Sequence, residues 1–290
     1  LAGDAIQDGS LNVVLGYDAG GGLTSASSSV LIGGFAGRAI TTGGGNVAVG
    51  YASLFTQGSN GSYSTAVGFR ALEDQNISSQ SHNVAVGYYA GREITTGNEN
   101  TLIGSEAGDA LTTGIENTVL GYQALSAAQT SHANVAIGHQ SLAMQSADGY
   151  TFNTAVGYNS GQQVTSGSQQ VLIGAYAGDA LTTGAQNIAI GYKALTGEDT
   201  GNKNIAIGTN ALEALNYNGD GYNIAIGHDA GKNVSTGVNN TIIGGLAGDA
   251  LTEGVGNTLL GNRAGGALTT GSYNVAVGMQ ALNSETANGG

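Results

Sequence analysis

Residues 100–121 read NTLIGSEAGDALTTGIENTVLG, and two phrases within this stretch decide the fold. The first phrase, of the type N-[VIT]-x-[VIL]-G, occurs in it twice, at 100–104 and 117–121. The second phrase, AGDALTTG at 107–114, is repeated at 177–184 and returns as AGDALTEG at 247–254. A chain that alternates the same short phrases is built from one repeated structural unit.

The glycine that ends the first phrase, called the reference glycine below, measures the period. Eleven of the fifteen intervals between successive reference glycines are seventeen positions long, one is eighteen and three are nineteen. The longest intervals follow every fourth copy, so four copies form a super-repeat, as from Gly87 to Gly157 and from there to Gly227. The sixteen reference glycines are Gly16, Gly33, Gly50, Gly68, Gly87, Gly104, Gly121, Gly138, Gly157, Gly174, Gly191, Gly208, Gly227, Gly244, Gly261 and Gly278.

This period predicts an all-β fold. A repeat this short has no room for two helices and two turns, but it fits one coil of a parallel β-solenoid. The residue one before the reference glycine is always Val, Ile or Leu, and the residue three before it is always Val, Ile or Thr. These residues share one face of a short strand. We expect about seventeen coils, with a second short strand in ITTG or LTTG stretches such as 94–97 and 111–114.

Asparagine stands four residues before the reference glycine in thirteen of the sixteen copies. Because the same residue then occupies the same turn in successive coils, the side-chain amides can hydrogen-bond from coil to coil. We expect a structural asparagine ladder at Asn83, Asn100, Asn117, Asn134, Asn153, Asn187, Asn204 and Asn223.

The strand is apolar on both faces. The residue two before the reference glycine is Ala in nine copies and Val, Leu or Ile in the other seven. A strand that is apolar on both faces is buried on both. One face can fill the interior of the solenoid, and the other would be an apolar stripe too large for a monomer to expose. The pattern therefore predicts self-association along the whole chain, most simply as a parallel homotrimer.

The super-repeat gives a single repetitive shaft in four blocks of coils, at about 12–82, 83–152, 153–222 and 223–290. In the first three blocks a longer connection follows the fourth reference glycine, and we expect these connections, at 73–82, 143–152 and 213–222, to bulge from the shaft. Residues 2–12 read as the tail of an earlier copy, so we interpret the chain as a fragment of a longer fibre.

The composition excludes several classes of function. Of 290 residues 52 are Gly and 40% are hydrophobic, which indicates an ordered chain rather than a flexible linker. The absence of Cys excludes disulfides, zinc thiolates and Cys nucleophiles. The formal net charge of −13 disfavours nucleic acid and anionic membranes as partners. No apolar run is long enough to span a membrane.

The sequence shows no sign of catalysis. It contains no GxSxG, HExxH, GxGxxG or P-loop motif, and we expect no enzyme activity, no cofactor and no metal. The four His residues lie in different coils and are interpreted as surface or interface residues, the alternative being a three-fold cluster that holds an ion on a trimer axis. Asp109, Asp179 and Asp249 in the repeated phrase are interpreted as solvated turn residues, because four coils separate them.

Phrases such as NVAVGYYAG, NTAVGYNSG and NIAIGYKAL resemble the repeats of phage tail-fibre proteins, and they are similar to the head repeats of trimeric autotransporter adhesins of the YadA type. The resemblance covers essentially the whole chain. It implies a left-handed β-roll or β-helix trimer displayed on a virion surface or, alternatively, outside a cell. The receptor-binding residues of these families map onto no position of this chain.

The resulting functional hypothesis is a structural fibre segment of a virus or phage that presents a receptor-binding tip for host attachment. Its alternative within the same class is a bacterial surface adhesin. A host glycan or protein receptor would be bound by a tip or by the shaft itself. The expected contacts on the shaft are aromatic residues of the longer connections, namely Tyr150, Phe152, Tyr217 and Tyr222.

An ice-binding solenoid is an alternative of another class. Threonines recur after the expected second strand, at Thr41, Thr95, Thr112, Thr182, Thr252 and Thr269. Ice binding requires a flat and regular array of Thr, and the fourth copy of each block interrupts this row.

Overall fold

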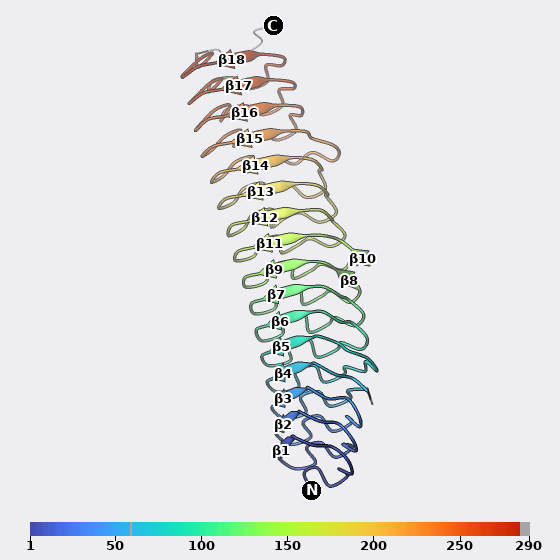
Figure 1. Cartoon of the computed structure of the whole chain (residues 1–290). Coiled ribbons are helices and arrows are strands. Elements are labelled where there is room, and N and C mark those ends of the chain that lie inside the picture. Colours follow the sequence, from blue (N-terminus) through green and yellow to red (C-terminus); the bar gives the residue numbers. More distant parts are fainter. Residues whose placement is uncertain (59, 285–290) are drawn as a thin grey trace. The chain divides into compact units, whose positions relative to one another are not determined.

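The structure is a computed structural model that describes residues 1–58 and 60–284. It is an all-β, parallel β-solenoid of about sixteen turns, and the described residues contain no helix. The chain forms two compact units, residues 1–151 and residues 152–290. In each unit the strands stack in one parallel sheet, with one strand from each coil (Figure 1).

The strands of the main sheet are three residues long and end directly before each reference glycine. The first unit contains β1 (Val13–Leu15), β2 (Val30–Ile32), β3 (Val47–Val49), β4 (Thr65–Val67), β5 (Val84–Val86), β6 (Thr101–Ile103), β7 (Thr118–Leu120) and β9 (Val135–Ile137). The second unit contains β11 (Thr154–Val156), β12 (Val171–Ile173), β13 (Ile188–Ile190), β14 (Ile205–Ile207), β15 (Ile224–Ile226), β16 (Thr241–Ile243), β17 (Thr258–Leu260) and β18 (Val275–Val277).

The register confirms the repeat deduced from the sequence. Val84 pairs with Thr101 and Thr101 with Thr118, so residues one repeat apart lie side by side in neighbouring coils. Residues 2–12 precede the first strand and contain none themselves. They nevertheless stack on the first coil, because the amide of Gly3 donates to the Ala19 carbonyl and that of Gln7 to the Thr24 carbonyl.

The structure shows which face of each strand points inward. The residue two before the reference glycine, the inner strand position, is fully buried in nearly every coil, as at Leu102 and Ala136. The residues one and three before the reference glycine, the outer strand positions, remain partly or fully exposed throughout both units. The narrow interior therefore takes one side chain from each strand.

Large and small residues share this interior between them. Every Leu or Ile at the inner strand position is followed six residues later by Gly, as Leu102 is by Gly108. A Cβ on Gly108 would lie 3.0 Å from Leu102 Cδ2 and 2.8 Å from Leu111 Cδ1. Where the strand contributes Ala136, the corresponding later position is Leu142, which is fully buried. The alternation keeps the interior close-packed without steric overlap.

The reference glycine is required by close approach between coils. Gly104 has φ +137°, and a Cβ there would lie 2.5 Å from the carbonyl oxygen of Gly121, the reference glycine of the next coil. That atom belongs to the backbone and cannot turn away. The same contact recurs at nearly every reference glycine, which explains why the repeat keeps Gly at this position.

The expected second strand in the ITTG and LTTG stretches is wrong. Residues 94–97 and 111–114 are bends and irregular backbone. In the first of them the amides of Thr95, Thr96 and Gly97 all donate to the carbonyl of Thr112, at 2.9, 3.3 and 3.2 Å. A strand ladder needs amides that bond successive carbonyls, so three donors converging on one acceptor mark a corner.

Candidate functional site

The asparagines that precede the strands form a buried, hydrogen-bonded row. The Oδ1 atom of Asn83 accepts the backbone N–H of Asn100 at 2.9 Å, and Asn100 repeats this contact with Asn117 at 3.0 Å. The Nδ2 atom of Asn100 donates to the Gly114 carbonyl at 2.9 Å and to Asn83 Oδ1 at 3.3 Å. Each side chain thus bonds two neighbouring coils, and Asn100 is fully buried.

The row extends beyond the eight asparagines singled out from the sequence. Asn46 belongs to it in the first unit, and Asn240, Asn257 and Asn274 continue it in the second. Their place four residues before a reference glycine is the sequence signal that identifies them. Where Gln170 replaces Asn, its Oε1 atom accepts the amide of Asn187 at 3.0 Å, so the longer amide keeps the row intact.

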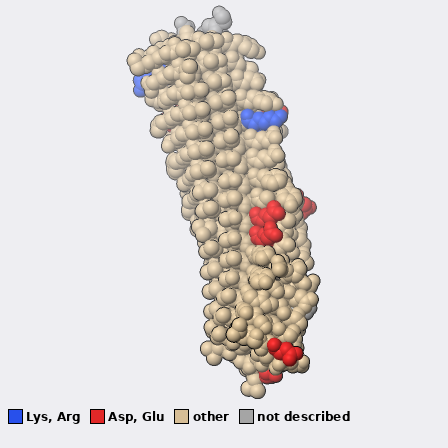
Figure 2. All heavy atoms as spheres, in the orientation of Figure 1, with Lys and Arg blue, Asp and Glu red and all other residues tan. Residues whose placement is uncertain are grey.

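The outer strand positions form an apolar face on each unit. All sixteen residues directly before a reference glycine are Val, Ile or Leu, and those three before it are ten Val or Ile and six Thr. In the middle coils of the first unit, Val86 and Ile103 are each 36% exposed and Leu120 is 44% exposed. The surface seen in Figure 2 likewise carries few charged side chains, and its neutral side chains align in columns from coil to coil.

A row of aromatic rings continues the first unit's surface beyond its strands. Tyr17 contacts Phe35 with ring centroids 5.3 Å apart, and Phe35 contacts Tyr51 at 5.7 Å. Tyr51 stacks on Phe69 at 5.4 Å, and Phe69 on Tyr88 at 5.6 Å. Tyr17, Tyr51 and Tyr88 directly follow a reference glycine, whereas the coil between Tyr17 and Tyr51 supplies its ring one residue later, at Phe35.

The first two expected receptor contacts are exposed. Tyr150 lies in the longer connection at 143–152, in the two-residue strand β10 (Gly149–Tyr150), which pairs with β8 (Ser131–His132). Tyr150 is 53% exposed, and its ring meets that of His132 edge-on, with centroids 5.0 Å apart. Phe152, which begins the second unit, is 54% exposed and has a left-handed backbone with φ 52°.

The other two expected contacts lie in the longer connection of the second unit. Tyr222 is half exposed and its hydroxyl accepts a hydrogen bond from Lys203 Nζ at 3.0 Å. Asp220 forms an ion pair with the same Lys203 at 2.6 Å. Tyr217 is only partly exposed, and its amide donates to Glu198 Oε2 at 3.3 Å. The described residues show no ring contact between Tyr217 and Tyr222.

Two carboxyl groups have unusual surroundings. Burial, and secondarily the nearby Glu106, raises the pKa of Asp109 to about 6, even though Arg92 acts in the opposite direction. Its Oδ1 atom is buried and accepts no hydrogen bond from the described residues. Glu198 is fully buried in the interior, and its burial raises its pKa although its Oε1 atom accepts the Gly201 amide at 2.7 Å.

The described residues contain no group of three His, Asp or Glu side chains that could hold a metal ion within one chain. Within the same residues no helix is long and apolar enough to cross a membrane.

Comparisons of the chain with protein-family models, curated proteins and solved structures found no significant match.

Proposed function

We propose that the chain is a structural fibre segment of a virus or phage, which spaces and presents a receptor-binding tip for host attachment at the virion surface. The observation that carries this proposal is the apolar outer strand face, repeated on every coil of both units. Each unit of a monomer would expose an apolar stripe along its strands, which soluble monomers rarely do.

The segment is stiffened by bonds that repeat in each coil. The parallel backbone ladder joins neighbouring coils, and the buried asparagine row adds side-chain bonds between coils on one side of the turn, as from Asn83 to Asn100 and from Asn100 to Asn117. Buried polar groups that are fully satisfied favour one arrangement of the chain over others. These features support a mechanical role better than a catalytic one.

The outer strand face supports a parallel homotrimer. Each coil places its outer Val and Ile side chains at its own height along the unit. Three parallel copies in the same register would therefore bring identical residues together around one axis. Charged residues are absent from all the outer strand positions, so no like charges would meet there. We assign these positions to the trimer interface.

The structure offers less support for ice binding. The hydroxyl of Thr95 donates to the Thr112 carbonyl at 3.1 Å, and that of Thr252 to the Thr269 carbonyl at 3.0 Å. These donors are used between coils of the protein, which limits their ability to order surface water.

The trimer interface is tested by placing charge on it. Ile190→Lys and Ile207→Lys, made together, should convert the trimer into monomers because buried unpaired ammonium groups are strongly unfavourable. Thr183→Lys, at an exposed position outside the outer strand face, is the control and should leave the trimer intact. A trimer that survives the double substitution would refute the assignment.

The fibre role is tested by electron microscopy with gold-labelled antibodies raised against residues 83–222. Gold on the fibres of virions supports the proposal. Gold confined to the surface of bacterial cells would overturn it in favour of a bacterial adhesin.

A further inference from the structure

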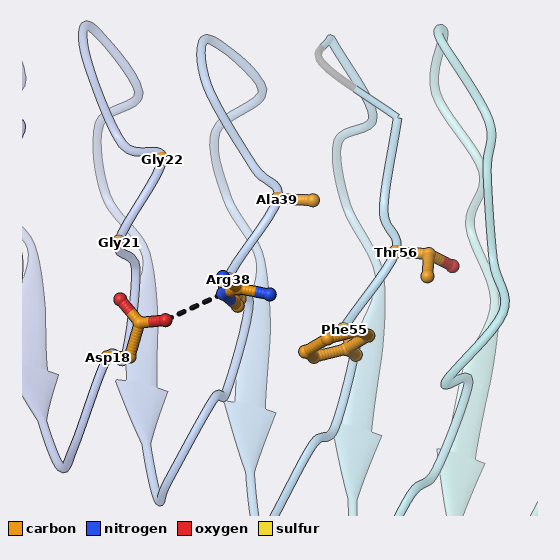
Figure 3. A pocket seen from close by; sticks show the side chains of 7 residues that line it. All are labelled: Asp18, Gly21, Gly22, Arg38, Ala39, Phe55 and Thr56. Atoms are coloured by element: carbon orange, nitrogen blue, oxygen red, sulfur yellow. Dashed lines mark hydrogen bonds and ion pairs between the residues drawn. The ribbon is translucent and has the colours of Figure 1, made fainter.

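The wall of the first unit contains a hollow of about 410 Å³ over the first three coils. Its lining comes from positions two, five and six residues after the reference glycines, outside the outer strand positions. Gly21, Arg38 and Phe55 each lie five residues after a reference glycine and so occupy equivalent places in three successive coils. Figure 3 shows Asp18, Arg38 and Phe55 on neighbouring coils along one side of this hollow.

Two glycines leave the hollow open. A Cβ at Gly21 would lie 2.3 Å from Asp18 Oδ1, and a Cβ at Gly22 would lie 2.9 Å from the Arg38 carbonyl oxygen. The second unit has Gln162 and Gln163 in the corresponding coil. The two glycines that open this space are therefore absent from the corresponding coil of the second unit.

A charged pair is fixed at the edge of the hollow. Arg38 Nε donates to Asp18 Oδ2 at 2.6 Å (Figure 3), while the guanidinium lies 5.5 Å from the centroid of Phe55 and 5.8 Å from that of Phe35. Among the described residues, the Nη atoms of Arg38 and the Oδ1 atom of Asp18 form no hydrogen bonds. The pair thus presents oriented donors beside an acceptor, and ring contacts hold the guanidinium in place.

A second hollow of about 310 Å³ shares Arg38 and Phe55 with the first and extends toward Tyr51 and Arg70. Arg70 forms an ion pair with Glu73 at 3.3 Å, which repeats the combination of guanidinium, carboxylate and aromatic ring. Together the two hollows make an elongated surface across several coils, each about 4.8 Å from the next.

We propose that these two hollows bind a neutral oligosaccharide. Aromatic faces such as that of Phe55 suit the apolar faces of pyranose rings, and a guanidinium beside a carboxylate can donate to and accept from neighbouring sugar hydroxyls. An anionic ligand is disfavoured because Asp18 and Glu73 stand beside the two guanidinium groups and because the chain carries a net charge of −13. An apolar ligand would leave the Arg38 and Asp18 groups unsatisfied.

This activity goes beyond the proposed structural role, because it assigns binding to the side of the shaft. Its residues are distinct from Tyr150, Phe152, Tyr217 and Tyr222. The second unit provides a natural comparison, because it has Asp179 in place of Arg38 and Thr196 in place of Phe55. There the Thr196 hydroxyl donates to Asp179 Oδ1 at 3.0 Å, and no aromatic ring occupies that position.

The test is isothermal titration calorimetry of the whole chain with maltohexaose, cellohexaose and hexa-N-acetylchitohexaose, and with hexagalacturonate as the anionic probe. At least one neutral hexasaccharide should bind saturably, and hexagalacturonate should not. Gly21→Gln and Phe55→Thr, which install the residues of the second unit, should each weaken binding at least tenfold. Tyr192→Ala, which removes an exposed ring elsewhere, should leave it unchanged.

Three results would overturn the proposal: no saturable binding of any neutral probe, preferential binding of hexagalacturonate, or binding that both Gly21→Gln and Phe55→Thr leave unaltered. Thermal unfolding followed by circular dichroism checks that the variants remain folded. The mass in solution is measured on the same samples. A monomer that binds the sugar would refute the trimer but would leave the proposed binding site standing.

Discussion

Replacing Asn100 by Ala removes one member of the asparagine row and should strongly destabilise the coils that it joins. In the native chain its Oδ1 atom accepts the Asn117 amide at 3.0 Å, and its Nδ2 atom donates to the Gly114 carbonyl at 2.9 Å. Neither the Asn117 amide nor the Gly114 carbonyl has another partner among the described residues. Both would become buried and unsatisfied in the variant.

The size of the effect follows from these two groups. Each buried polar group that loses its only partner costs about 1 to 3 kcal/mol, so Asn100→Ala should lower the free energy of unfolding by about 4 kcal/mol. Asn100→Ser should cost only about 2 kcal/mol. The reason is visible at Ser29, which holds the same position in the second coil and whose Oγ atom accepts the Asn46 amide at 3.2 Å.

The assay combines chemical unfolding, followed by circular dichroism, with hydrogen exchange measured by mass spectrometry. The peptide that contains the Asn117 amide should exchange faster in Asn100→Ala, because local opening there becomes cheaper. Asn76→Ala is the control, since Asn76 is exposed in the same unit and its side chain makes no hydrogen bond with the described residues. Equal stability of Asn100→Ala and Asn76→Ala would refute the structural role of the row.

Two further predictions concern the backbone and pH. Gly104→Ala should lower the free energy of unfolding by more than about 4 kcal/mol in chemical unfolding, because the new Cβ would overlap the Gly121 carbonyl. Gly149→Ala is the control and should cost only about 1 to 2 kcal/mol, because no atom lies within 4 Å of its new Cβ. Similar costs for the two variants would contradict the packing argument. Asp109→Asn should raise the free energy of unfolding relative to the native chain by about 1 kcal/mol at pH 8 and should leave it unchanged at pH 3.5. The figure is reduced to allow for solvent screening of this half-buried group. The sign follows because the pKa of Asp109 is raised from 3.8 to about 6 in the folded state, so the native chain loses stability as pH rises through this range. Thermal unfolding across pH measures the difference, and a pH-independent effect would refute the role of the charge.

The repeat and the strands were predictable because their signals are carried by residue identity at a fixed spacing. The glycine at position 104 and its equivalents set the period, and the strand before each of them follows from alternating β-branched residues. The asparagine row was predictable for the same reason, because stacked coils place equal positions next to each other.

The remaining features depend on packing that the pattern of residue types does not determine. Both faces of the strand are apolar, so the pattern of residue types does not decide which face points inward. Leu102 points inward and Ile103 outward because the space beside Gly108 accommodates the Leu102 side chain. The expected strand at 94–97 was wrong because one carbonyl, that of Thr112, receives three amides there. The hollow at Arg38 depends on the difference in side-chain volume between Gly21, Arg38 and Phe55, which occupy equivalent positions in successive coils.

The most direct test of the central claim is the mass of the chain in solution, measured by size-exclusion chromatography with light scattering at micromolar concentration. The apolar outer strand face predicts a trimer, with three times the chain mass of 28.6 kDa. A stable monomer of 28.6 kDa that exposes this face without aggregating would contradict the claim.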